Sequence, residues 1–138
     1  MVRKVLSKYG ENPPADSKAP RKISTREPIN PVHEVLQVLQ AHLPKVMTKR
    51  SIKFMQRHRF DDEELRDLIK YALEYGRYID SEWCEFSDIS PWFACDSYQV
   101  KRREYIEASH KELEICYFLK FCIHKSGNLI CTLSFHFS

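Results

Sequence analysis

The chain has 138 residues and a mass of 16.4 kDa, which is enough for one domain and too few for two of ordinary size. Hydrophobic residues make up 43% and aromatic residues 12%, a composition that excludes a globally disordered chain. The formal net charge of +3 does not by itself require a nucleic-acid partner. Only three glycines are present and no glycine-rich phosphate-binding motif occurs, which argues against P-loop and dinucleotide-binding domains.

The five cysteines form no C-x-x-C pair, which argues against a disulfide framework and against a zinc ribbon. We expect them to be reduced, small apolar side chains in a cytoplasmic protein. Residues 1–8 contain no apolar signal-peptide core. No apolar run approaches the ~20 residues that span a bilayer, so no membrane partner is expected. Metal and cofactor sites are likewise not expected from the motifs present.

Charge is distributed in blocks of opposite sign. Residues 1–30 contain seven Lys/Arg and three acids, and residues 42–60 contain six Lys/Arg and no acid. Residues 61–90 contain ten acids and only three bases. The small total therefore conceals two basic blocks and one acidic block, and the basic blocks are candidate anion-binding surfaces.

Proline is concentrated near the N-terminus, where five of the seven prolines lie within residues 9–31. Large apolar residues are scarce there, so we interpret 1–29 as a flexible basic tail, at most partly docked, and 30–138 as a single domain. Asn30 followed by Pro31 is typical of an N-cap and first helical position. The apolar spacing that follows predicts a helix over 31–42.

Two further helices are predicted. Thr48 can cap a helix over 49–58, and the spacing of apolar residues predicts another over 62–75. Asp61 and Glu64 form the D-x-x-E pattern of a capping box in front of that third helix. Gly76 is a natural stop for it.

After Gly76 the apolar period changes from 3.6 to 2, which predicts strands. The expected strands are 82–86, 92–99, 113–123 and 128–137. A glycine-containing turn over 125–128 joins the last two as a hairpin. Helices followed by consecutive strands indicate an α+β fold, with the N-terminal helices packed on one face of a C-terminal antiparallel sheet.

Alternation sorts the last hairpin into two faces. The expected core face carries Tyr117, Leu119, Phe121, Ile123, Leu129, Cys131, Leu133, Phe135 and Phe137. The other, open face carries Cys116, Phe118, Lys120, Cys122, Thr132, Ser134 and His136. A Lys, a Ser and a His beside an aromatic ring can bind a polyanion, although a half-solvated sheet face is the simpler interpretation.

The region 32–137 resembles the MqsR (motility quorum-sensing regulator) family of toxins. The resemblance is carried by four short stretches in the family's order and spacing: Glu82-Trp83-Cys84-Glu85, Cys95-Asp96-Ser97-Tyr98, Phe118-Leu119-Lys120 and Ser134-Phe135-His136. It implies a RelE-like fold and a toxin of a type II toxin–antitoxin system. Such a toxin binds and cleaves mRNA without a metal or cofactor and is inhibited by a cognate antitoxin protein.

Four positions that carry catalytic groups in the family hold other residues here. They are Glu85, Cys95, Phe118 and His136, in place of lysine, glutamine, tyrosine and lysine. The segment between Tyr98 and Phe118 is also about ten residues longer than in the family. The resemblance therefore leaves two hypotheses open: an RNA-cleaving toxin, and a non-catalytic relative that binds protein or nucleic acid.

Cleavage by 2′-OH attack requires an acid, a base and stabilisation of the phosphorane. Our candidates are His136 as acid or base, Lys120 for the phosphate charge, and Tyr98 or Tyr117 as proton donor or stacking partner. The candidate RNA-binding residues are Lys49, Lys53, Arg57, Lys101, Arg102 and Arg103. The first three recur at i, i+4 and i+8 and form one basic stripe, for which a solvated helix face is the alternative.

Overall fold

A computed structural model describes residues 3–138, and in it three helices precede most of a six-stranded sheet. The helices are α1 (Val32–Ala41), α2 (Lys49–Arg57) and α3 (Asp62–Tyr75). The strands are β1 (Lys22–Ile23), β2 (Lys45–Val46), β3 (Arg77–Cys84), β4 (Phe93–Ile106), β5 (Lys111–Ile123) and β6 (Ile130–Phe137). A short 3-10 helix (Glu107–Ser109) lies between β4 and β5. The three predicted helices and four predicted strands are confirmed, but β3 begins at Arg77 rather than 82 and β4 continues to Ile106 rather than ending at 99.

The strand order in the sheet is β1-β3-β4-β5-β6-β2. Strands β3 to β6 form the expected antiparallel meander. At its edges, β1 pairs antiparallel with β3, whereas β2 pairs parallel with β6. The sheet is therefore mixed, because β2 runs parallel to β6, and this corrects the purely antiparallel prediction. Both short edge strands come from segments that the sequence patterns placed outside the sheet.

Local capping explains where α2 and α3 begin. The Thr48 hydroxyl accepts a hydrogen bond from the Ser51 N–H, and Asp61 and Glu64 form the predicted capping box. The start of α1 differs from the prediction. Pro31, not Asn30, occupies its N-cap position, and Asn30 is buried beneath the helix, where its amide contacts the sheet.

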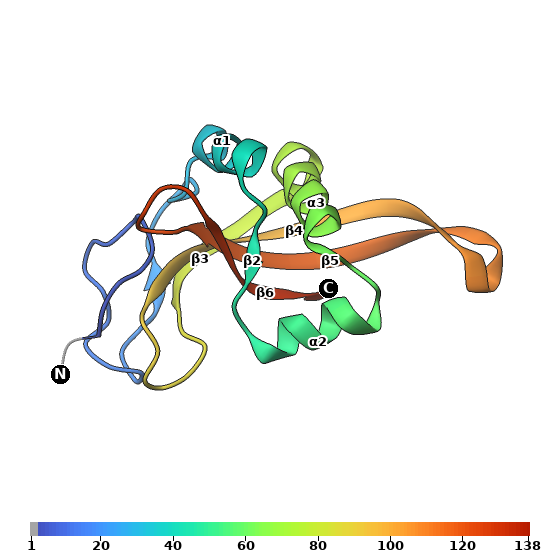
Figure 1. Cartoon of the computed structure of the whole chain (residues 1–138). Helices are drawn as coiled ribbons and strands as arrows, with labels where there is room; N and C mark the ends of the chain where they lie inside the picture. The colour runs from blue at the N-terminus through green and yellow to red at the C-terminus, as the bar shows by residue number, and fades with distance from the viewer. Residues whose placement is uncertain (1–2) are drawn as a thin grey trace.

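Helices α1 and α3 lie together on one side of the sheet, and α2 lies apart from them beside β6 (Figure 1). The main core joins Val35, Leu39, Leu65, Leu68 and Ile69 of the helices to Val100, Leu119, Phe121, Ile130 and Phe135 of the strands. The three helices are therefore not grouped together on one face of the sheet as predicted, since α1 and α3 lie together and α2 lies beside β6. At its edge, α2 protects β6 because the Ser51 hydroxyl accepts a hydrogen bond from the Phe135 N–H, at 3.1 Å.

A β-bulge between Lys120 and Phe121 changes the predicted faces of the last hairpin. On the C-terminal side of β6, Phe135 faces the core and His136 the open face, as alternation predicts. On the N-terminal side of the bulge, the side chains of β6 face the opposite side of the sheet from the one predicted. Cys131 and Leu133, predicted in the main core, lie in a second apolar cluster on the open face, together with Cys84, Phe93, Cys95 and Cys122. Thr132, predicted on the open face, is buried on the other.

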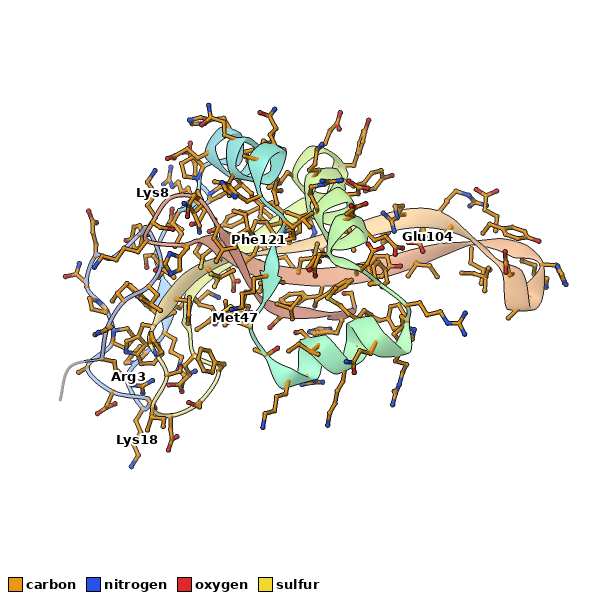
Figure 2. The ribbon with its side chains drawn as sticks, in the orientation of Figure 1. Arg3, Lys8, Lys18, Met47, Glu104 and Phe121 are labelled. Atoms are coloured by element: carbon orange, nitrogen blue, oxygen red, sulfur yellow. The ribbon has the colours of Figure 1, made fainter. Side chains whose placement is uncertain are left out.

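The predicted flexible tail is instead packed against the sheet over its described part, 3–29, while residues 1 and 2 lie outside the described residues. Backbone hydrogen bonds join Leu6 to Trp92 and Lys8 to Ile123, and β1 extends the sheet. Val5, Tyr9, Ile23 and Ile29 pack around Trp83 and Trp92 in a third apolar cluster. Figure 2 shows Arg3 at the end of the molecule opposite Glu104. Hydrogen bonds and apolar contacts therefore dock this proline-rich segment on the sheet, which corrects the prediction of a flexible tail.

Strands β4 and β5 continue well past their neighbours as a two-stranded ribbon (Figure 1). Their pairing runs without interruption from Asp96–Phe121 to Ile106–Lys111. The segment between Tyr98 and Phe118, which the sequence comparison predicted to be longer than in the MqsR family, forms this extended hairpin. No helix within residues 3–138 combines the length and apolar character needed to cross a bilayer.

Candidate nucleic-acid interface

Four residues predicted on the open face form two adjacent cross-strand pairs of β5 and β6. Lys120 lies opposite Ser134, and Phe118 lies opposite His136. The Phe118 ring connects the two pairs. It stacks on the His136 ring with centroids 5.0 Å apart, and the Lys120 Nζ lies 5.7 Å from its centroid. The structure therefore brings together the two principal sequence-predicted site residues, Lys120 and His136.

The His136 ring is oriented by a hydrogen bond as well as by stacking. Its Nδ1 lies 2.8 Å from the Phe137 carbonyl oxygen. Because a carbonyl oxygen only accepts, Nδ1 carries the hydrogen in this contact. In the neutral ring the Nε2 is consequently the unprotonated nitrogen. His136 can accept a proton at Nε2, and donate one from there once it is charged.

Lys120 is only 16% exposed and forms an ion pair with Glu82 of β3. Burial acts to lower the pKa of Lys120, but the neighbouring Cys84 sulfur and the hydrogen bond and charge of Glu82 together raise it above its ordinary value. Lys120 is therefore positively charged at neutral pH. Beside it lies a small hollow of about 160 Å³, which Glu82, Ser134 and Arg21 also line.

A larger hollow of about 320 Å³ separates α2 from the end of β6. We call it the α2–β6 groove. Its lining residues are Arg50, Lys53, Phe54, Arg57, His58, Phe135, His136 and Phe137. The groove thus joins three cations of α2 to the His136 ring of the open face, over a floor of aromatic rings.

The basic side chains of α2 have no anionic partners among the residues that the structure describes. Lys49, Arg50, Lys53 and Arg57 are all exposed, and among residues 3–138 none of them lies within ion-pair distance of a carboxylate. Figure 2 shows nitrogen-tipped side chains projecting freely from this helix. Lys49 and Arg50 occupy the first turn, where the helix dipole disfavours cations. This arrangement has a local energetic cost that binding of an anion would relieve.

The stripe predicted from Lys49, Lys53 and Arg57 is only partly correct. Lys53 and Arg57 line the α2–β6 groove, and Arg50 completes the row at i, i+3 and i+7. Lys49 faces a neighbouring hollow instead, beside Phe86. Sequence analysis missed Arg50 and His58, although the helical spacing of Arg50 relative to Lys53 is a signal that could have identified it.

The two predicted tyrosines lie on the opposite face of the sheet from Lys120 and His136. Tyr98 is 4% exposed and stacks on Phe121 within the main core, and burial raises its pKa. Tyr117 is 2% exposed, and its hydroxyl donates to the Glu104 carboxylate at 2.7 Å. Burial, followed by that hydrogen bond, raises the pKa of Tyr117. Neither tyrosine is placed to act with His136, which corrects their assignment to the site.

The three basic residues of the ribbon are divided between its faces. By alternation along β4, Lys101 and Arg103 lie on the open face. Arg102 lies on the helix side, where its guanidinium carbon is 5.8 Å from the centroid of the Tyr117 ring. Arg102 pairs with Glu104 and Arg103 with Glu112, at 2.9 and 3.3 Å. Lys101 is exposed and, among the described residues, has no such partner. Only Lys101 therefore extends the basic surface with an uncompensated charge.

Two of the positions predicted to differ from the MqsR family, Glu85 and Cys95, have structural roles. Glu85 lies just after β3, where Arg3, Arg21 and Ser17 bind its carboxylate. Cys95 is fully buried in the second apolar cluster, and burial raises the pKa of its thiol well above its ordinary value. All five cysteines are free in the structure. Glu85 and Cys95 thus offer neither a cation nor a proton-transfer group to a bound phosphate.

In comparisons with known proteins, no protein-family model, curated protein or solved structure matches the chain. The resemblance to the MqsR family therefore stays a prediction. Within residues 3–138, no three or more His, Cys, Asp and Glu side chains gather in a way that could hold a metal ion.

Proposed function

We propose that this chain binds RNA in the α2–β6 groove and acts as the toxin of a type II toxin–antitoxin system. The observation that carries the proposal is the row of cations on α2 beside His136, which have no ion-pair partner within residues 3–138. Exposed Lys and Arg groups bind the phosphate backbone, and aromatic rings stack unpaired bases. The helices followed by the meander β3–β6 also support a RelE-like fold. A cognate antitoxin would cover the groove and block RNA.

The chemistry that the site supports is metal-independent cleavage by the RNA 2′-OH. His136 exchanges a proton through Nε2, and the Lys120 ammonium stabilises the charge that develops on the phosphorane. Both groups lie on the open face, next to the groove that would hold the neighbouring phosphates. The earlier tyrosine candidates have no part in this scheme.

The binding part of the proposal is tested by charge reversal. Arg50→Glu, Lys53→Glu and Arg57→Glu together should abolish most binding of a short single-stranded RNA, measured by fluorescence anisotropy. Binding by the wild type should weaken steeply with salt, because the contacts release counterions from phosphates. The matched control carries Lys18→Glu, Lys70→Glu and Lys125→Glu, three exposed bases outside the groove. Equal loss in both variants would show only a net-charge effect.

The catalytic part is tested by incubating the purified protein with RNA, with and without EDTA. We expect cleavage that EDTA does not inhibit. A specific observation favours a second candidate, a non-catalytic nucleic-acid-binding module: the four altered family positions and the neutralisation of Lys120 by Glu82. RNA binding that depends on α2, with no cleavage of any RNA tested, would select this alternative.

A further inference from the structure

The small hollow beside Lys120 contains two carboxylates with very different surroundings. Glu85 is 12% exposed and is held by Arg3, Arg21 and Ser17, so its charge is compensated within the fold. Glu82 is 32% exposed and has Lys120 as its only ion-pair partner among the described residues. The cation opposite it on β1, Lys22, pairs with Asp80 instead, at 3.5 Å. Glu82 is thus the accessible carboxylate of the hollow.

Glu82 shares the open face with the candidate catalytic residues. It lies opposite Cys95 in the β3–β4 pairing, and its carboxylate reaches the Lys120 ammonium two strands away. Ser134 faces Lys120 across β5–β6, and both line the hollow with Glu82. Along this face the order is therefore a carboxylate, an ammonium and an imidazole, with the Phe118 ring between the last two.

We propose that Glu82 is the general base of RNA cleavage, with His136 as the general acid. This inference rests on the proposed function. Glu82 accepts the 2′-OH proton as the 2′-oxygen forms a bond to phosphorus. The bond from phosphorus to the 5′-oxygen breaks, and that oxygen takes a proton from His136. The products are a 2′,3′-cyclic phosphate and a 5′-hydroxyl, and Lys120 carries the phosphorane charge between the two groups.

A purely structural Glu82 predicts the opposite effect on rate. If Glu82 only neutralises Lys120, removing its charge frees the ammonium for phosphate, and both affinity and cleavage should rise. If Glu82 is the base, Glu82→Gln should bind RNA at least as tightly as the wild type and cut it far more slowly. The combination of retained binding and lost cleavage therefore separates the two roles.

The experiment measures single-turnover cleavage of a short RNA from pH 4 to 8 by the wild type, Glu82→Gln, Glu82→Asp and Glu74→Gln. Glu74→Gln removes an exposed carboxylate on α3 and is the matched control. Glu82→Gln should cleave roughly 10²–10⁴-fold more slowly and lose the acidic limb of the pH–rate profile. Glu82→Asp should keep that limb at a reduced rate, and it provides the test if Glu82→Gln does not fold.

Wild-type rates in Glu82→Gln, or an unchanged acidic limb, would overturn the role of Glu82 and leave the proposed function standing. If Glu82→Gln does not fold, a Glu82→Asp variant that cuts at the wild-type rate would overturn it in the same way. A wild type that cuts no RNA would overturn both. The two failures are therefore distinguishable in one set of reactions.

Discussion

His136 is the residue on which the proposed chemistry most depends, and its environment permits a clean test. It is stacked on Phe118, outside the buried core, and its hydrogen bond is to a neighbouring carbonyl. His136→Ala should reduce single-turnover cleavage by roughly 10²–10⁴-fold, as loss of a general acid or base does. The urea midpoint should change little. Cleavage at the wild-type rate would move the site away from the open face.

Asp96 shows how a single buried residue holds the N-terminal segment to the sheet. It is fully buried and accepts hydrogen bonds from the Ile29 and Asn30 N–H groups, at 3.0 and 2.8 Å, and from the Ser81 hydroxyl at 2.5 Å. Asn30 in turn accepts from the Ile123 N–H at 2.9 Å. The contacts of Ile29 and Asn30 join residues 66 to 93 positions apart in the chain.

Asp96→Ala should therefore be among the most damaging single substitutions. Its donors would remain buried without an acceptor, at about 1–3 kcal/mol for each unsatisfied group, so the free energy of unfolding should fall by about 3 kcal/mol or more. Urea denaturation measures this change. Asp88→Ala, in an exposed loop, is the control and should have little effect. A similar small effect at Asp96 would mean that water replaces the lost acceptor.

For individual residues, the sequence predicts which side chains are exposed better than it predicts which residues they pair with. Alternation correctly placed Lys120 and His136 on the open face and Tyr117 on the core face. It could not reveal that Lys120 pairs with Glu82, because that contact crosses two strand pairings. The role of Asp96 was equally hidden, since Ile29 belongs to the predicted flexible tail and Asn30 was predicted to cap a helix rather than to contact the sheet.

Among the elements, the end of α3 depends on a close approach that only glycine permits. Gly76 has φ of −83°, which any residue can adopt, so a left-handed cap is not the reason for glycine here. A Cβ at Gly76 would instead lie 2.5 Å from the Ala72 carbonyl oxygen and 3.0 Å from that of Gln99. The helix therefore turns directly into β3 with its backbone against β4.

Gly76→Ala should destabilise the protein by about 1–3 kcal/mol, because overpacking forces the backbone to shift. Thermal or urea unfolding measures the loss. Gly10→Ala is the matched control, since its Cβ would meet only the Val5 side chain at an ordinary 3.8 Å. If both variants unfold at the same urea concentration, the backbone at the end of α3 is free to adjust.

Helices and strands were predicted correctly where the local sequence signal was strong. They were missed or misoriented where pairing between distant segments determines the structure. The capping box and apolar spacing fixed α3, and the change of period located β3 to β6. The bulge at Lys120 and Phe121 left no local signature, so it reversed the predicted faces of Cys131 and Leu133. The edge strands β1 and β2, two residues each, are too short for any periodic pattern.

Over the whole molecule, the three blocks of charge in the sequence differ in how far ion pairs within the fold neutralise them. Bases of the N-terminal block find acids within the fold: Arg3 and Arg21 pair with Glu85, Lys8 with Glu34 and Lys22 with Asp80. The α2 block finds none among the described residues. The acidic block thus compensates part of the N-terminal segment and leaves α2 available to an external anion.

Docking of the N-terminal segment should accordingly depend on pH through Glu85. Burial acts to raise the pKa of Glu85, but hydrogen bonds from Arg3 and Ser17 and the charge of Arg21 lower it below its ordinary value of 4.5. Folding therefore favours the ionised carboxylate. Its stabilising contribution is complete above pH 4.5 and is lost as the pH falls through the lower value of the folded state.

Glu85→Gln provides the matched variant, because glutamine approximates the size and neutrality of a protonated glutamate. The wild type should be more stable than Glu85→Gln at pH 7. The difference should shrink as the pH falls from 4.5 through the lower pKa of the folded state, because in that range the unfolded carboxylate binds a proton that the folded one does not. Urea denaturation of both proteins from pH 7 to pH 3 measures it. Amide hydrogen exchange of residues 3–23 at pH 7 should be faster in the variant, since Arg3 and Arg21 lose the negative charge of their shared carboxylate. A stability difference that does not change with pH would show that the carboxylate charge does not hold this segment to the sheet.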